Sequence, residues 1–381
     1  MDDGDGNGNS TAAAVGVEYD DSGELEEEAE EEEYEVEELV DDAPMHIYRR
    51  LFLGSIDAAR NEQALSKARI AFTLALLGAE DRGEGIAAAP APHEGVASGA
   101  GGAAGGVNNH QLSARDEAAV VMRTQVAIED ALDEDLFHKL PMILAALNNI
   151  LEEAERADKN VLVHCVAGRS RSPSVVAAWL LTQSPGDKYP SIKHVIDEIS
   201  FIRPWIEINA HFQSELQLFH AVVASKELLQ QDTVMSLMNR RRKLPRVDFG
   251  ESLVADILAG KKTITMRLQS DLEDDCNSDL KAVFPHSTVF ATTRLSENIH
   301  NVSTTTTTST LTSPARQPFA VLYVQQVTTK CLHELDTQDL QKSGFASVPQ
   351  VLVVLKQFYP HVTDATPLLM LHFACIGQVL S

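Results

Sequence analysis

The chain has 381 residues, enough for two domains that each bury a core. Its formal net charge is −25, but residues 1–45 hold 19 Asp and Glu and no Lys or Arg, so the remainder carries only −6. The folded part is therefore only mildly acidic. The cysteines lie far apart without a Cys-x-x-Cys pair, which argues against a disulfide framework or a zinc site; they are Cys165, Cys276, Cys331 and Cys375.

Residues 1–45 are predicted to be a disordered acidic tail, because their acid run contains too few apolar residues to form a core. The N-terminus has no apolar segment of the kind that a signal peptide needs. No apolar run approaches about 18 residues, so no membrane span is predicted. We therefore expect a cytoplasmic or nuclear protein, and the sequence leaves its oligomeric state open.

Residues 46–222 alternate between strand and helix patterns. Strands are predicted over 47–56, 70–77, 120–128 and 161–163, and helices over 57–67, 135–157, 174–181 and 192–202. The Gly/Ala-rich stretch at about 82–110 is predicted to be a disordered insertion in a surface loop, with a lid as the alternative. This order of elements predicts an α/β fold with a central mixed sheet flanked by helices.

A Cys-x5-Arg loop follows the strand at 161–163. Its backbone N–H groups can cradle phosphate oxygens, and Arg171 can grip two of them with a planar fork. Ser172 suits the N-cap and Pro173 the first position of the next helix, whose positive end would face an anion. In such a setting Cys165 is predicted to be a thiolate nucleophile. The predicted phosphate-binding residues are Val166, Ala167, Gly168, Arg169, Ser170 and Arg171.

The run from His164 to Ser172 resembles the His-Cys-x-x-Gly-x-x-Arg-Ser signature of the cysteine-dependent phosphatases, most closely their dual-specificity branch. The segment from Ile202 to Phe212 resembles the closing helices of that family. The resemblance implies the cysteine-phosphatase fold over residues 46–222 and a phosphocysteine formed on Cys165. It also implies that Ser172 bonds the sulfur and that His164 orders the loop.

The family's general acid is an Asp just after the strand that precedes the long helix. Four carboxylates lie there: Glu129, Asp130, Asp133 and Asp135. Asp130 stands at the strand end, 35 positions before the cysteine, and is the predicted acid; Asp133 is the alternative.

The resemblance implies a dual-specificity protein phosphatase that acts on phosphotyrosine and on phosphoserine or phosphothreonine in proteins. No cofactor and no metal are predicted. Arg169 adds a positive side chain at the loop, so a phosphoinositide or an RNA phosphate stays open as substrate. The alternative from another class is an RNA-binding adaptor.

Residues 223–246 are predicted to be a linker with a basic cluster at 240–243, and a second domain is predicted over 247–381. It contains a short helix near 254–258, strands at 288–293, 319–327 and 368–375, and a mostly helical segment at 335–359. A Thr-rich stretch at about 296–316 is predicted to be a second disordered insertion.

The run from Gly260 to Arg267 resembles the ASCH domain, which implies a small β-barrel with helices, related to the PUA fold. Lys262 and Thr265 match two catalytic positions of the amidohydrolases in that family. Lys342-Ser343-Gly344 stands where their Glu should fall, which argues against this activity. RNA or nucleotide binding is predicted instead, through Lys261, Lys262, Thr265 and Arg267.

Overall fold

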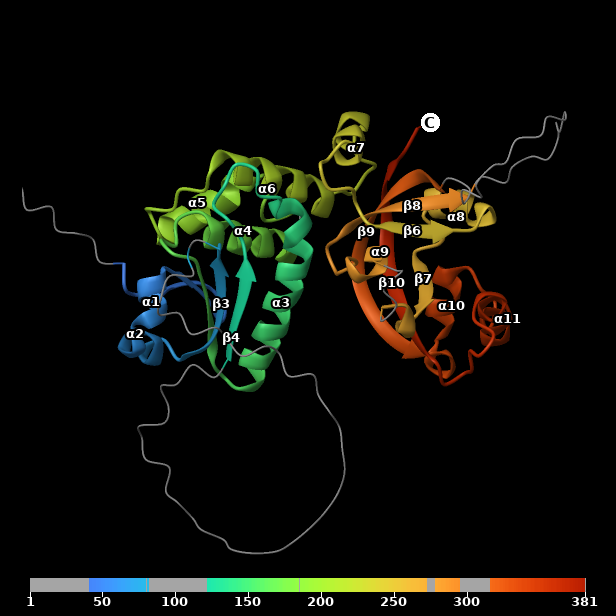
Figure 1. Cartoon of the computed structure of the whole chain (residues 1–381), viewed down its shortest axis with the longest axis horizontal. Helices are drawn as coiled ribbons and strands as arrows, with labels where there is room; N and C mark the ends of the chain where they lie inside the picture. The colour runs from blue at the N-terminus through green and yellow to red at the C-terminus, as the bar shows by residue number, and fades with distance from the viewer. Residues whose placement is uncertain are drawn as a thin grey trace, which may run out of the picture. The chain divides into compact units, whose positions relative to one another are not determined.

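The computed structural model describes residues 41–79, 81, 122–184, 186–272, 278–294 and 316–380 (Figure 1). The acidic run at 1–40, nearly all of the Gly/Ala-rich insertion and nearly all of the Thr-rich insertion lie outside these residues. The predictions of disorder made for them stay predictions.

The first sheet has five strands in the order β1-β2-β5-β3-β4. The pair β1·β2 is antiparallel, and the pairs β2·β5, β3·β5 and β3·β4 are parallel, as predicted for a mixed sheet. The strands span Met45–Tyr48 (β1), Leu51–Gly54 (β2), Ile70–Leu77 (β3), Met122–Ala127 (β4) and Asn160–His164 (β5). The central position of β5 brings its C-terminal end to the middle of the sheet edge, where the Cys165 loop begins.

Helix α4 is the core helix of this domain, since every residue from Arg171 to Leu181 is buried. It packs on β2, β3 and β5 and against α3, α5 and α6 (Figure 1). The helices span Ile56–Arg60 (α1), Glu62–Lys67 (α2), Leu136–Arg156 (α3), Arg171–Gln183 (α4), Ile192–Ile202 (α5) and Ala210–Val223 (α6). Because α4 is buried on all sides, its position is fixed. The N-terminus of this helix closes the candidate site.

Two local predictions are wrong. The single strand over 47–56 is a hairpin that turns at Arg49, whose φ is 50°, and Arg50. The helix over 57–67 is two helices separated at Asn61, whose side chain accepts from the Ala64 N–H at 3.0 Å and caps α2. The break at Asn61 arises because a polar side chain takes up a local backbone bond inside an otherwise continuous pattern.

The domain also begins earlier than predicted. Asp41 and Asp42, assigned above to the tail, are held by the domain: Ser55 Oγ donates to the Asp41 carbonyl at 2.5 Å, and Asn61 Nδ2 to the Asp42 carbonyl at 3.1 Å. The amino-acid composition could not show that Asp41 and Asp42 belong to the domain and not to the acidic tail, because the residues that bind them lie elsewhere in the chain.

The second sheet has five strands in the order β6-β8-β9-β10-β7, of which β6·β8 is parallel and the other pairs are antiparallel. The strands span Arg246–Phe249 (β6), Ile264–Leu268 (β7), Thr288–Arg294 (β8), Arg316–Cys331 (β9) and Pro367–Gln378 (β10). Among the described residues β6 and β7 are the outer strands, and Arg267 Nη2 links them by donating to the Asp248 carbonyl at 2.5 Å. Closure into a barrel therefore stays a prediction.

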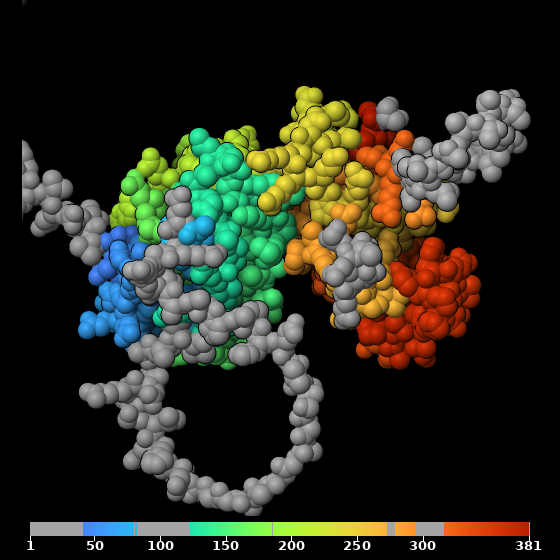
Figure 2. All heavy atoms as spheres, viewed as in Figure 1, coloured from blue at the N-terminus to red at the C-terminus, as the bar shows by residue number. Residues whose placement is uncertain are grey.

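Helices α10 and α11 cover the β7–β10 side of this sheet. Val351 and Leu355 of α11 belong to one buried cluster with Ile264 of β7 and Met370 of β10, and the two helices form a compact lobe in the space-filling view (Figure 2). Gly344, with φ 82°, ends α10. The helices of this part are Gln231–Met238 (α7), Val254–Leu258 (α8), Ser278–Lys281 (α9), Thr337–Ser343 (α10) and Val348–Phe358 (α11), so the predicted linker contains a helix.

Candidate active site

The loop between β5 and α4 encloses the Cys165 sulfur. Gly168 has φ 64°, and a Cβ added there would lie 2.5 Å from the Gly54 carbonyl oxygen, so this position needs glycine. The turn points the Gly168 N–H at Cys165 Sγ, 3.2 Å away. The cysteine is 2% exposed.

Ser172 gives the sulfur a second donor. Its Oγ lies 3.2 Å from Cys165 Sγ, as the resemblance implied. The predicted N-cap role is wrong, because α4 begins at Arg171 and Ser170 occupies the N-cap position. The two donors and the N-terminal end of α4 would all stabilise negative charge on the sulfur.

Arg171 lies close enough to Cys165 for their charges to interact. It is 7% exposed, and Nη1 donates to Asp81 and to the Ile128 carbonyl, the latter at 3.3 Å. Burial opposes ionisation of Asp81, but hydrogen bonds from Arg171 and the Gly78 N–H outweigh it and lower the pKa of that carboxyl. Arg171 Nε is buried and forms no hydrogen bond among the described residues; it faces Asp130 Oδ2 at 3.8 Å.

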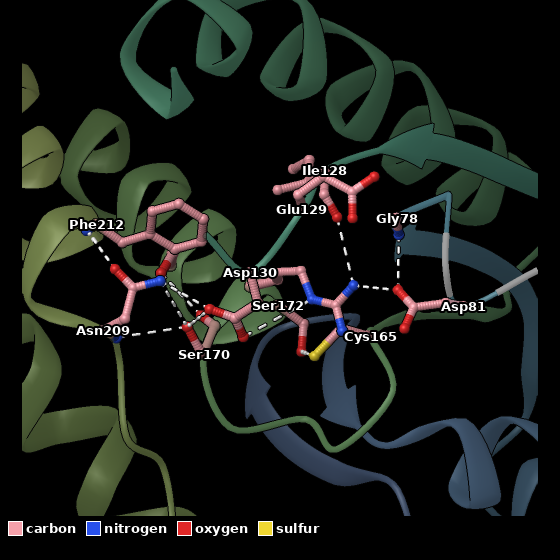
Figure 3. Close-up of polar contacts among 12 residues, drawn as sticks. Gly78, Asp81, Ile128, Glu129, Asp130, Cys165, Ser170, Ser172, Asn209 and Phe212 are labelled. Atoms are coloured by element: carbon pink, nitrogen blue, oxygen red, sulfur yellow. Dashed lines mark hydrogen bonds and ion pairs between the residues drawn. The ribbon is translucent and has the colours of Figure 1, made fainter. Parts of the chain in front are cut away.

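Asp130 is the candidate acid that the structure brings to the loop. Its Oδ2 lies 3.8 Å from Arg171 Nε, and its Oδ1 accepts from Ser170 Oγ at 2.8 Å and from Asn209 Nδ2 at 2.7 Å (Figure 3). Its side chain is 38% exposed, so the carboxyl is held in place yet open to a ligand.

The other three carboxylates have different surroundings. Asp133 is exposed and forms no hydrogen bond or ion pair within the described part of the chain. Asp135 caps α3 and pairs with His138 and Arg240; burial opposes its ionisation, but these partners lower its pKa far below the usual value. Glu129 accepts from the Ala79 N–H at 2.6 Å.

His164 lies behind the loop rather than at the sulfur. It is 6% exposed, and its Nδ1 lies 3.3 Å from the carbonyl oxygen of Cys165. Burial lowers the pKa of His164 to about 4, so the ring is neutral near pH 7. This contact fits the ordering role that the resemblance implied.

Arg169 does not stand alone at the rim of the loop. Its guanidinium pairs with the exposed Glu207 carboxylate, and the Glu207 N–H donates to the Arg169 carbonyl at 2.8 Å. The second positive charge predicted at this loop is thus neutralised by a neighbour.

Four residues at the site were missed by sequence reasoning: Asp81, Arg203, Glu207 and Asn209. Three of them lie in or next to the segment compared with the family's closing helices, which was the available signal. Asp81 adjoins the low-complexity insertion, and no pattern there marks it.

In the second domain, the predicted RNA-contact residues are only partly open to solvent. Lys261 is exposed, whereas Lys262 is 5% and Thr265 4% exposed. Lys262 Nζ donates to the Ser343 carbonyl at 2.5 Å; burial and then repulsion from Arg267 lower the pKa of Lys262 to about 8. Arg267 donates to backbone oxygens of its own sheet. The ammonium of Lys262 is thus buried against the Ser343 carbonyl and is not exposed at the surface as a phosphate contact would require.

Within the described ranges, no three His, Cys, Asp or Glu side chains gather as a metal site would require. No described helix is both long and apolar enough to cross a membrane.

Residues 107–222 match the sequence model of the family "Dual specificity phosphatase, catalytic domain". Two curated relatives are the Arabidopsis thaliana protein-tyrosine-phosphatase IBR5, 29% identical over 98 residues, and the Drosophila melanogaster dual specificity protein phosphatase MPK-4, 32% identical over 103 residues. These alignments cover 26% and 27% of this chain, and they span only 37% and 24% of the two relatives.

Among solved structures, human DUSP28 is 26% identical with a TM-score of 0.31, covering 46% of this chain and 90% of that one. The Yvh1 phosphatase domain of Chaetomium thermophilum is 23% identical with a TM-score of 0.33, covering 46% and 95%. By the family match and the curated relatives, the segment that holds Cys165, Arg171 and Asp130 is similar to the catalytic domain of dual-specificity phosphatases.

Proposed function

We propose that the protein hydrolyses phosphotyrosine and phosphoserine or phosphothreonine in proteins through a phosphocysteine intermediate. One observation carries this proposal: Cys165 Sγ, with donors at 3.2 Å from Gly168 and Ser172, lies close to the charged guanidinium of Arg171, whose Nε forms no hydrogen bond among the described residues. A phosphate bound there would have the sulfur on one side and a planar cationic fork at its equatorial oxygens.

In the first step, Cys165 sulfur attacks phosphorus and the bond from phosphorus to the leaving oxygen breaks. Asp130 gives its proton to that oxygen. In the second step, water attacks the phosphocysteine, the sulfur–phosphorus bond breaks, and Asp130 takes the proton from the water. Ser172 Oγ donates to the departing sulfur. Arg171 and the loop amides stabilise the charge on the equatorial oxygens in both steps.

The test is turnover of phosphotyrosine and phosphothreonine peptides by the purified chain and by Cys165→Ser. The variant should be inactive yet still bind phosphate, because Arg171 and the loop amides remain while a serine hydroxyl is not ionised near pH 7. Rapid quenching of the wild type should place a phosphoryl group on Cys165. Turnover retained by Cys165→Ser would overturn the mechanism.

A phosphoinositide or RNA 5′-phosphate is the second substrate candidate, since Arg169 stands at the rim of the loop. The same assay with these phosphates decides between the classes. RNA binding by the second domain is a separate candidate, supported by the exposed Lys261. Affinity of the full chain for single-stranded RNA should fall with salt and with Lys261→Ala; no binding at low salt would exclude it.

A further inference from the structure

A fully buried arginine lies behind the phosphate loop. Arg203 exposes none of its surface; its Nε donates to the Gly168 carbonyl at 2.9 Å and its Nη2 to the Ala167 carbonyl at 3.3 Å. The guanidinium also lies over the Trp205 ring, 4.9 Å from its centroid. The Ala167 carbonyl and the Gly168 N–H belong to one peptide unit and point in opposite directions, so the bond from Arg203 to that carbonyl orients the Gly168 N–H toward the Cys165 sulfur.

Within the part of the chain that the structure describes, the carboxylate of Asp41 is the one that pairs with Arg203. Arg203 Nη1 donates to Asp41 Oδ1 at 2.9 Å, and Nη2 pairs with Asp41 Oδ2. The backbone of Asp41 is fixed in turn by Ser55 Oγ. This carboxylate lies before β1, far outside the residues 107–222 that match the family.

We propose that Asp41 is a positioning residue of the phosphate loop, acting through Arg203; this inference rests on the proposed function. A buried guanidinium without its carboxylate is strongly disfavoured. Removal of Asp41 would therefore draw Arg203 toward solvent and release the carbonyls of Ala167 and Gly168. The loop amides would then lose the orientation that they need to bind an anion.

The first test compares Asp41→Asn with Asp42→Asn in the full chain. Asp42 is the matched control, because its carboxylate accepts from Asn61 Nδ2 at 3.0 Å and not from Arg203. The dissociation constant of inorganic phosphate is measured by its protection of Cys165 from iodoacetate, followed by peptide mass spectrometry. We expect about tenfold weaker phosphate binding and about tenfold lower kcat/KM for an aryl phosphate in Asp41→Asn, and values within twofold of wild type in Asp42→Asn. Wild-type phosphate binding in a folded Asp41→Asn protein would overturn the proposal.

A second variant separates positioning from stability. The double variant Asp41→Asn with Arg203→Gln buries no uncompensated charge, so its melting temperature should recover toward that of the wild type. Its phosphate binding should stay weak, because glutamine is shorter than arginine and carries its donors on one nitrogen, whereas Arg203 reaches the two loop carbonyls with Nε and Nη2. Recovery of wild-type phosphate affinity together with the melting temperature would overturn the proposal. The protection of Cys165 by phosphate is measured without turnover. If the protein were inactive toward every phosphoester, the proposed function would be overturned, but the comparison of phosphate binding between the variants would still test the role of Asp41.

Discussion

The Arg171 guanidinium and the Asp81 carboxylate form an ion pair beside the phosphate loop (Figure 3). The same Asp81 oxygen accepts from the Gly78 N–H at 2.7 Å, which ties it to the end of β3. The Ile128 carbonyl, at the end of β4, holds the same Nη1. Two strand ends thus fix the orientation of the guanidinium before any phosphate arrives, and an oriented fork loses less freedom on binding.

Asp81→Asn is expected to weaken phosphate binding and to lower kcat/KM by about tenfold, about 1.4 kcal/mol, because Arg171 loses its charged partner. The lowered pKa of Asp81 keeps this carboxyl ionised above about pH 4. The stability that the ionised Asp81 carboxylate contributes is therefore fully present above that pH. It is lost only as the pH falls through the pKa that Asp81 has in the folded protein. The effect of the substitution should accordingly be constant between pH 5 and 8.

Phosphate inhibition constants for wild type, Asp81→Asn and Asp57→Asn provide the measurement. Asp57 is the control, since it is exposed on α1 and lies 3.9 Å from Arg60 in a surface pair. Tighter phosphate binding in Asp81→Asn would show instead that this carboxylate competes with the substrate for Arg171.

Asp130→Asn is expected to lower kcat by about 10²–10⁴-fold for alkyl phosphates and much less for aryl phosphates with good leaving groups. This expectation rests on the position of the Asp130 carboxyl. Asn209 Nδ2 donates a hydrogen bond to Asp130 Oδ1, and Asp130 Oδ2 lies 3.8 Å from Arg171 Nε. Asp133→Asn, the matched control, should leave both substrates unchanged. If Asp133→Asn shows the dependence on leaving group and Asp130→Asn does not, the assignment of the acid is wrong.

The sequence predicted those parts of the fold and site that depend on neighbouring residues. The Cys165 loop could be predicted because the spacing of Cys165, Gly168 and Arg171 is local. Strand β3 could be predicted because its residues are apolar apart from Thr73. The roles of Asp81 and Asp41 could not be predicted, because each pairs with an arginine at least 90 positions away in the sequence. No neighbouring residue distinguishes them from other acids. The inward direction of Lys262 also escaped prediction, because its partner, the Ser343 carbonyl, comes from another element.

Glu207→Gln is expected to change substrate preference. Without its carboxylate partner, Arg169 is free to contact a second phosphate on the substrate. Since an exposed ion pair contributes at most about 1 kcal/mol, kcat/KM for a doubly phosphorylated peptide should rise up to about fivefold relative to a singly phosphorylated one. The gain should vanish in the double variant Glu207→Gln with Arg169→Ala. An equal gain on both peptides would mean that Glu207 acts only through the general charge of the site.

The burial of Lys262 makes a prediction about stability in the second domain. Burial and repulsion from Arg267 lower the pKa of Lys262 to about 8, against about 10.5 in the unfolded chain. Between these values the unfolded state binds more protons, so the free energy of unfolding should rise with pH across that interval. The shift corresponds to about 3 kcal/mol for this group. Lys262→Met should lack this rise, whereas Lys261→Met, at an exposed position, should keep it.

Urea denaturation of the full chain at several pH values from 7 to 10.5 measures this difference. All other groups titrate in the three proteins alike, so the difference between Lys262→Met and wild type isolates the lysine. Parallel curves for wild type and Lys262→Met would show that the ammonium of Lys262 is charged in the folded protein throughout, which would require solvent or an anion at Nζ.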